Sequence, residues 1–338
     1  MSGRPGDPYR APAVLSLRPA VSYPERSKMA KAGTGTNLRQ QLIKTFENPA
    51  YRPPPLPTIA LEIQALSRHE DATIEDVVRL LEKDEMLAGS VIRLVASPLY
   101  AGRGPVRSLG DAVIRLGVRT VRDVVFESAL RRGVFDLPEY RETIEQIGRH
   151  SRATAYIARS VCKHARINDD MAFLCGLLHD IGFAALLFSA ARAKPGPTLA
   201  EMWSDIDALH EQGSKLVTKL WGLPADLSTI VGAHHHVHTG ATSRMAAAIT
   251  FSDYLTSHFG LSIVGPPDAE GTLLPGDAVV EVDVSDSRSL LGLDDNALTR
   301  IFTEVEPLIA QITSEASVMP EAISLAPTSI AASRRSRA

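Results

Sequence analysis

The chain has 338 residues, of which 44% are hydrophobic, and it carries a formal net charge of −3. This apolar content is enough for a buried core, and the lack of a strong positive charge argues against nucleic acid as a partner. The two cysteines, Cys162 and Cys175, both lie in apolar segments, which argues against a disulfide framework and indicates a reducing, cytoplasmic compartment. We identify no run of about 18 apolar residues and therefore expect no membrane-spanning segment.

The two ends and one internal stretch are expected to be irregular. Residues 1–50 are rich in Pro, Gly and Ser and are predicted to be mostly disordered apart from a short amphipathic piece at 38–46; Met29 is an alternative start to Met1. Gly, Pro and acidic residues dominate 261–287, which predicts an insertion loop, either loose or with a short hairpin around 278–284. Residues 316–338 are predicted to be a disordered tail.

Residues 51–135 show the spacing of an N-terminal helical subdomain. The apolar residues recur at helical rather than alternating positions and predict helices at 58–66, 71–81, 86–95, 108–116 and 120–130. Ser108 is placed to cap the fourth of these helices, and Gly117 is expected to stop it. This half contains no convincing strand pattern.

Residues 136–260 continue the helical pattern, and a further helix region follows at 288–315. The expected helices cover 137–164, 169–188, 199–220, 226–233, 243–259 and 294–312. The predicted fold class is therefore all-α.

A set of histidines and aspartates falls on these predicted helices. His179 and Asp180 stand side by side at the end of an apolar helical run, and further donors on other helices are spaced so that they can meet them: His150, His210, His234, His235 and Asp253. Imidazole and carboxylate together suit iron, manganese, zinc or nickel. One ion would be held with His150 and Asp253, and a second with His210, His234 and His235, while an aspartate can bridge two ions. The alternative for Asp253 is a charge on a helix surface.

Five stretches give the chain a specific resemblance. They are Pro54-Pro55-Leu56-Pro57, residues 78–84 (VRLLEKD), residues 91–100 (VIRLVASPLY), residues 108–117 (SLGDAVIRLG), and Trp221-Gly-Leu-Pro224 followed by His234-His235. In order and spacing the chain resembles the HDOD family, the HD-related output domain of bacterial signalling proteins. The resemblance implies a smaller N-terminal helical subdomain packed on an HD-like helical bundle.

The resemblance also implies a site of the HD phosphohydrolase superfamily. It carries over seven candidate metal ligands: His150, His179, Asp180, His210, His234, His235 and Asp253. The chain departs from the HD-GYP relatives because no Gly-Tyr-Pro follows the histidine pair, and because Gln146 stands where those relatives have an extra glutamate ligand.

Three functions remain open at this stage. The first is a cytoplasmic signalling regulator that retains a metal site with one or two ions. The second is an active metal-dependent phosphohydrolase on a nucleotide or other phosphoester, with Asp180 and His210 as catalytic residues. The third is a metal-free protein-interaction scaffold. The expected partner is a signalling protein or a phosphorylated small molecule, and the sequence leaves the substrate, the metal and the oligomeric state open.

Overall fold

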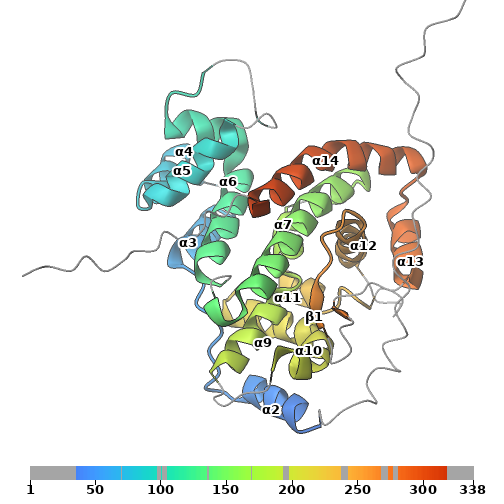
Figure 1. The fold of residues 1–338 in the computed structure, drawn as a ribbon. Coiled ribbons are helices and arrows are strands. Elements are labelled where there is room, and N and C mark those ends of the chain that lie inside the picture. Colours follow the sequence, from blue (N-terminus) through green and yellow to red (C-terminus); the bar gives the residue numbers. More distant parts are fainter. Residues whose placement is uncertain are drawn as a thin grey trace, which may run out of the picture.

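The structure is a computed structural model that describes residues 36–69, 71–96, 100, 105–134, 137–168, 170–192, 198–236, 243–267, 273–276 and 281–317. Helices follow one another along this part of the chain, with one short hairpin between them (Figure 1), so the all-α prediction is confirmed. The segments 1–35 and 318–338, expected to be disordered, lie outside the described residues.

The first helices are α2 (Thr36–Glu47), α3 (Thr58–Leu66), α4 (Ile74–Leu81), α5 (Glu85–Val95) and α6 (Leu109–Gly133). Their starts follow the sequence: Thr73 and Ser108 form capping boxes with the aspartates three residues later, and Asp84 caps α5. In Figure 1, α4 and α5 pack with the first part of α6 at one end of the molecule. Helix α2 covers the short amphipathic piece expected at 38–46, and Leu42 is buried where α2 packs on α9 and α10.

Gly117 interrupts α6. Its φ of 77° and ψ of 153° lie outside the helical region, so the two parts of α6 meet at a kink. A positive φ of this size is costly for residues with a Cβ atom, which explains why glycine stands there. The predicted stop at Gly117 is therefore confirmed.

The second half forms the larger bundle. After a 3-10 turn at Pro138–Tyr140 come α7 (Arg141–His164), α8 (Ala172–Leu178), α9 (Ile181–Ala191), α10 (Leu199–Leu220), α11 (Ala225–Val231) and α12 (Arg244–His258). Helix α7 packs against both α8 and α12, and α9 packs along α10. Phe173, Phe183, Trp203 and Phe251 fill the core between these helices. Cys162 and Cys175 are buried and are not joined by a disulfide.

The helix expected at 169–188 is two helices, α8 and α9, which meet at His179 and Asp180. Asp180 has left the helical conformation (φ −106°, ψ 13°), and the His179 ring bonds back to the Gly176 carbonyl at the end of α8. Apolar residues continue on both sides of this break, because both helices are buried on all faces. A hydrophobic pattern therefore cannot reveal the break.

The stretch Ala172–Ala191, which covers α8 and α9, is long and apolar enough to cross a membrane by length and composition. This corrects the expectation that the chain has no such run. In this fold 89% of the apolar window is buried inside the protein, where α8 packs on α7 and α9 on α10. Its hydrophobicity is accounted for by its place in the core.

The C-terminal part differs most from expectation. Strands β1 (Val264–Pro267) and β2 (Leu273–Pro275) form an antiparallel hairpin before the predicted hairpin position. Residues 281–287, predicted as loop, begin α13 (Glu281–Leu291), because Val284, Ser287 and Leu291 form a buried helical face and α13 packs on α12. The last helix, α14 (Asp295–Ser317), lies along α7, where Ser160 and Lys163 bond to Glu304.

Candidate metal centre

Seven predicted donor residues meet in the middle of the larger bundle. They come from α7 (His150), the α8–α9 break (His179 and Asp180), α10 (His210), the turn after α11 (His234 and His235) and α12 (Asp253). None of the seven is more than 6% exposed. Asp253 is fully buried, so its alternative interpretation as a surface charge is wrong.

One half of the cluster is built around His150. Its Nε2 atom lies 3.2 Å from Nε2 of His179, 3.2 Å from Oδ1 of Asp253 and 3.7 Å from Oδ2 of Asp180. Nε2 of His179 lies 3.3 Å from the same Asp180 oxygen. Single donor atoms of His150, His179 and Asp180 are close enough together to hold one ion.

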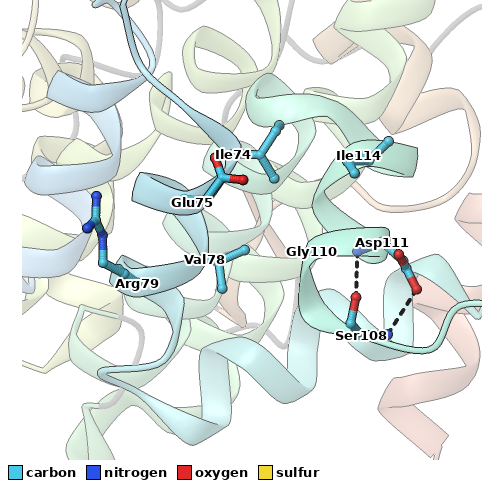
Figure 2. Close-up of a pocket in the computed structure, with 8 residues that line it drawn as sticks. All are labelled: Ile74, Glu75, Val78, Arg79, Ser108, Gly110, Asp111 and Ile114. Atoms are coloured by element: carbon cyan, nitrogen blue, oxygen red, sulfur yellow. Dashed lines mark hydrogen bonds between the residues drawn. The ribbon is translucent and has the colours of Figure 1, made fainter.

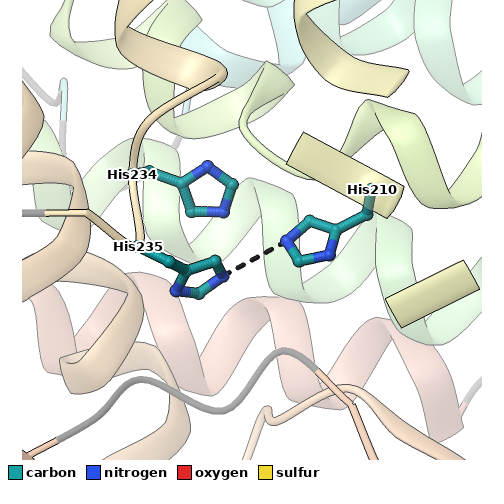
Figure 3. A group of neighbouring side chains, drawn as sticks. All are labelled: His210, His234 and His235. Carbon is teal, nitrogen blue, oxygen red and sulfur yellow. Dashed lines mark hydrogen bonds between the residues drawn. The ribbon is translucent and has the colours of Figure 1, made fainter. Parts of the chain in front are cut away.

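The other half contains three histidines, shown in Figure 3, whose donor atoms are also close enough together to hold one ion. Nε2 of His210 lies 3.2 Å from Nε2 of His235. The second oxygen of Asp180, Oδ1, lies 3.5 Å from Nε2 of both His210 and His234. Asp180 therefore faces one histidine group with each of its two oxygens.

The backbone fixes which nitrogen four of the rings present to the centre. Nδ1 lies 2.8 Å from the Leu261 carbonyl in His150, 2.8 Å from that of Gly176 in His179, and 2.7 Å from that of Val231 in His234. His210 makes the same kind of contact with the Asp207 carbonyl. Because a carbonyl oxygen only accepts, each Nδ1 must carry the proton and donate it. In the neutral ring this leaves the Nε2 lone pair for a ligand, as in protein metal sites.

Glu211 is a residue of this site that the sequence reasoning missed. Its carboxylate accepts from the backbone N–H of His235 at 3.0 Å and lies 3.2 Å from Nδ1 of His236, so it ties α10 to the histidine turn. Burial raises the pKa of Glu211, but His234, His210, the His235 N–H and His236 together lower it below the ordinary value. Glu211 directly follows the candidate ligand His210, which is the feature of the sequence that could have indicated it. The sequence around Glu211 does not show that its side chain reaches the turn after α11.

The donor set fits a divalent transition metal. Four imidazoles oriented through Nδ1, a fifth at His235, and two buried carboxylates are the ligands that zinc, iron, manganese and nickel accept. His236, beside the cluster, has a side chain that is 56% exposed and contacts Glu211. His238 lies outside the described residues.

A groove of about 520 Å³ lies elsewhere, between α4 and the start of α6 (Figure 2). It is lined by Ile74, Glu75, Val78, Arg79, Ser108, Gly110, Asp111 and Ile114. Two of its polar groups, Ser108 and Asp111, are already engaged in the capping box of α6. The convergent donors of the buried cluster make that cluster, and not this groove, the candidate functional site.

Fold and site together define an all-helical domain with a buried histidine–aspartate centre. The sequence model of the HDOD domain matches residues 54–237, more than half of the chain, and the chain belongs to the HDOD domain family. The family resemblance seen in the sequence is thus confirmed. An uncharacterized protein from Treponema pallidum (strain Nichols) is 25% identical over 200 residues, which is 54% of this chain and 38% of that protein. The chain therefore spans less than half of this curated relative.

Solved structures share the fold. An HDOD domain protein of unknown function from Geobacter sulfurreducens is 22% identical, with a TM-score of 0.59 over 83% of this chain and 98% of its own. A candidate metal-dependent phosphohydrolase from Shewanella amazonensis SB2B is 18% identical, with a TM-score of 0.56 over 76% and 97%. A candidate signal transduction protein from Marinobacter aquaeolei VT8 is 21% identical, with a TM-score of 0.54 over 87% and 68%.

Proposed function

We propose that this chain is an HDOD regulator of cytoplasmic signalling whose bundle holds divalent transition metal at the histidine–aspartate centre. One ion would be held by His150, His179, Asp180 and Asp253. A second would be held by His210, His234 and His235, beside the other oxygen of Asp180. The partner is a signalling protein or a phosphorylated small molecule that responds to the state of this centre.

The observation that carries the proposal is the short Nε2–Nε2 distance between His150 and His179. Both rings donate through Nδ1 to backbone carbonyls, so in the neutral rings both Nε2 atoms carry lone pairs, and these repel each other at a distance of 3.2 Å. A positive centre must therefore lie near this pair: either a metal ion or a shared proton on an imidazolium. Nearby Asp180 and Asp253 carboxylates stabilise both. A metal satisfies all of these donors at once, whereas protons alone correspond to the metal-free scaffold.

A second candidate function is a metal-dependent phosphohydrolase. It is favoured by the position of Asp180, whose two oxygens face separate histidine groups. Bound ions would supply Lewis-acid activation of water and of a phosphate oxygen. In that function Asp180 orients both halves of the site, and His210, held through Nδ1 by the Asp207 carbonyl, keeps its Nε2 directed at the reacting region. The name of the Shewanella protein is consistent with such chemistry.

The two candidates are separated by turnover. Wild-type protein is reconstituted with Mn²⁺, Fe²⁺, Zn²⁺ or Ni²⁺ and assayed on generic phosphomonoesters, phosphodiesters and nucleotides. Asp180→Asn is assayed in the same way, and the control is His69→Ala, which changes an exposed histidine outside the site. The regulator account predicts no turnover above that of Asp180→Asn with any metal. Turnover by wild type and His69→Ala that falls by about 100-fold or more in Asp180→Asn would establish the hydrolase instead.

Metal binding itself is read from stability. A ligand that binds only the folded state raises the free energy of unfolding by about 2.7 kcal/mol at a concentration 100 times its Kd. We expect added metal to raise the Tm of wild type and of His69→Ala but not that of Asp180→Asn. An equal rise in all three proteins, or none in wild type, would contradict a metal at this centre.

A further inference from the structure

The hairpin and the residues leading into it run beside the metal centre, from α7 to α10. Just after α12 the backbone carbonyl of Leu261 accepts from Nδ1 of His150 at 2.8 Å, and the Ser262 carbonyl accepts from Nε2 of Gln146 at 3.1 Å. Strand β1 then contacts α10. In Figure 1, β1 lies in front of the bundle, between α7 and α10. One end of this segment is thus bonded directly to a donor residue of the centre.

The other end rests on Trp203 of α10. A Cβ atom at Gly265 would lie 2.4 Å from Nε1 of the indole, and one at Gly276 would lie 2.6 Å from its Cζ2 atom. Side chains do not tolerate such distances, so β1 at Gly265 and the chain just after β2 at Gly276 approach the ring this closely only because these two positions are glycine. The hairpin seals the indole, which is 1% exposed.

Trp203 is connected in turn to the second half of the centre. Its ring centroid lies 5.7 Å from that of Phe183, and Phe183 stacks on His210 with centroids 4.5 Å apart and an angle of 17° between the planes. The segment therefore contacts the first histidine group through the Leu261 carbonyl and the second through Trp203 and Phe183.

Because the donor side chains are buried, part of the protein must move before an ion or a ligand can reach them. His150, His179, Asp180 and Asp253 are all 0% exposed, so neither a hydrated ion nor a phosphate ester reaches them while these neighbours stay in place. The helices α7, α10 and α12 are 24, 22 and 15 residues long, whereas β1 and β2 have 4 and 3 residues. Short strands make fewer contacts than long packed helices and open more easily, even though Ile263 of this segment is buried in the core.

We propose that residues 261–267 and 273–276 form a movable cover over the metal centre, seated on Trp203, and that their displacement admits the ion and any phosphorylated ligand. The identity of the ion and ligand that enter the site rests on the proposed function, whereas the motion of the cover does not. Trp203, Gly265 and Gly276 act as positioning residues for the cover. The glycine–indole contact sets how firmly the cover closes.

The test measures access to the buried histidines in metal-free protein. Wild type and Gly265→Ala are treated with diethylpyrocarbonate, and the reaction of His150 and His179 is followed by peptide mass spectrometry. The exposed His69 serves as the reference for reagent strength. The matched control is Gly110→Ala, where a Cβ atom meets its nearest neighbour at an ordinary 3.6 Å.

The proposal predicts that Gly265→Ala raises the reaction rate of His150 by about tenfold, because the added methyl group overpacks the contact with Trp203 and so favours the displaced hairpin. The reaction rate of His69 should stay the same in all proteins, and that of His150 should be the same in Gly110→Ala as in wild type. Equal protection of His150 in a folded Gly265→Ala protein would overturn it. If Gly265→Ala does not fold, Trp203→Phe, which shrinks the seat under Gly276, is used with the same two outcomes. Because no metal is needed, this result is independent of whether the parent binds metal.

Discussion

At the residue scale, Glu211 connects two elements that carry donors. Its carboxylate holds the His235 N–H and His236, and it lies 3.9 Å from Nδ1 of His234. Because it is a largely buried anion beside several histidines, its charge stabilises the folded state, and its contribution depends on pH.

We predict that Glu211→Gln lowers the free energy of unfolding at pH 7 by about 1.5–3 kcal/mol, the size of a hydrogen bond to a charged group. The folded-state pKa of Glu211 is lowered below 4.5, so its contribution is present above pH 4.5 and is lost as the pH falls through the folded value. Urea unfolding at pH 7 and at acid pH should therefore show a wild-type advantage that shrinks in acid. A difference that is the same at both pH values would contradict this role.

The histidines and aspartates that converge in the bundle could be predicted from sequence, but the orientation of their side chains could not. Histidine and aspartate at these seven positions were candidates by residue type and by family resemblance, and the structure brings all seven together. The Leu261 carbonyl that orients His150, and Glu211 behind the histidine turn, act across 111 and 24 residues of sequence. Such contacts depend on how helices pack, which no local pattern records.

At the element scale, the close approach of α9 to α10 positions His210. A Cβ atom at Gly182 would lie 1.9 Å from the backbone oxygen of His210 and 2.7 Å from the amide of Ser214. The Gly182 N–H also donates to the Ser214 hydroxyl at 2.9 Å. These backbone neighbours cannot turn aside as a flexible side chain would.

We predict that Gly182→Ala lowers the free energy of unfolding by at least about 2 kcal/mol, because the added methyl group forces α9 away from α10. Gly110→Ala is the matched control and should change stability by less than about 1 kcal/mol. Thermal and urea unfolding of both variants measure the effect. A Gly182→Ala protein as stable as the control would show that this helix contact does not constrain the fold.

Most helices could be predicted from periodicity and caps, and the failures have identifiable causes. Thr73, Ser108 and Gly117 act where the sequence places them. The break at His179–Asp180 was not predicted because α8 and α9 are buried on all sides. They therefore lack the polar face from which hydrophobic periodicity is recognised. Helix α13 was not predicted because its apolar face can be recognised only from its packing against α12.

At the scale of the whole molecule, the fold places every element that carries a donor around one buried point. The smaller group of α4, α5 and the first part of α6 holds an open groove, while the larger bundle holds the centre (Figures 1 and 2). The boundaries between such parts, drawn from sequence at 51–135 and 136–260, remain a proposal. Signalling through this protein would then couple the state of the centre to surfaces of the surrounding helices.

The most direct test of this account is elemental analysis of the purified and metal-reconstituted protein. Wild type and His69→Ala are predicted to carry one to two transition-metal ions per chain, His235→Ala to keep only the ion held with His150, and Asp180→Ala to lose both, with circular dichroism confirming that each variant is folded. A wild-type protein without metal after reconstitution, or a folded Asp180→Ala protein with its full metal content, would contradict the metal centre.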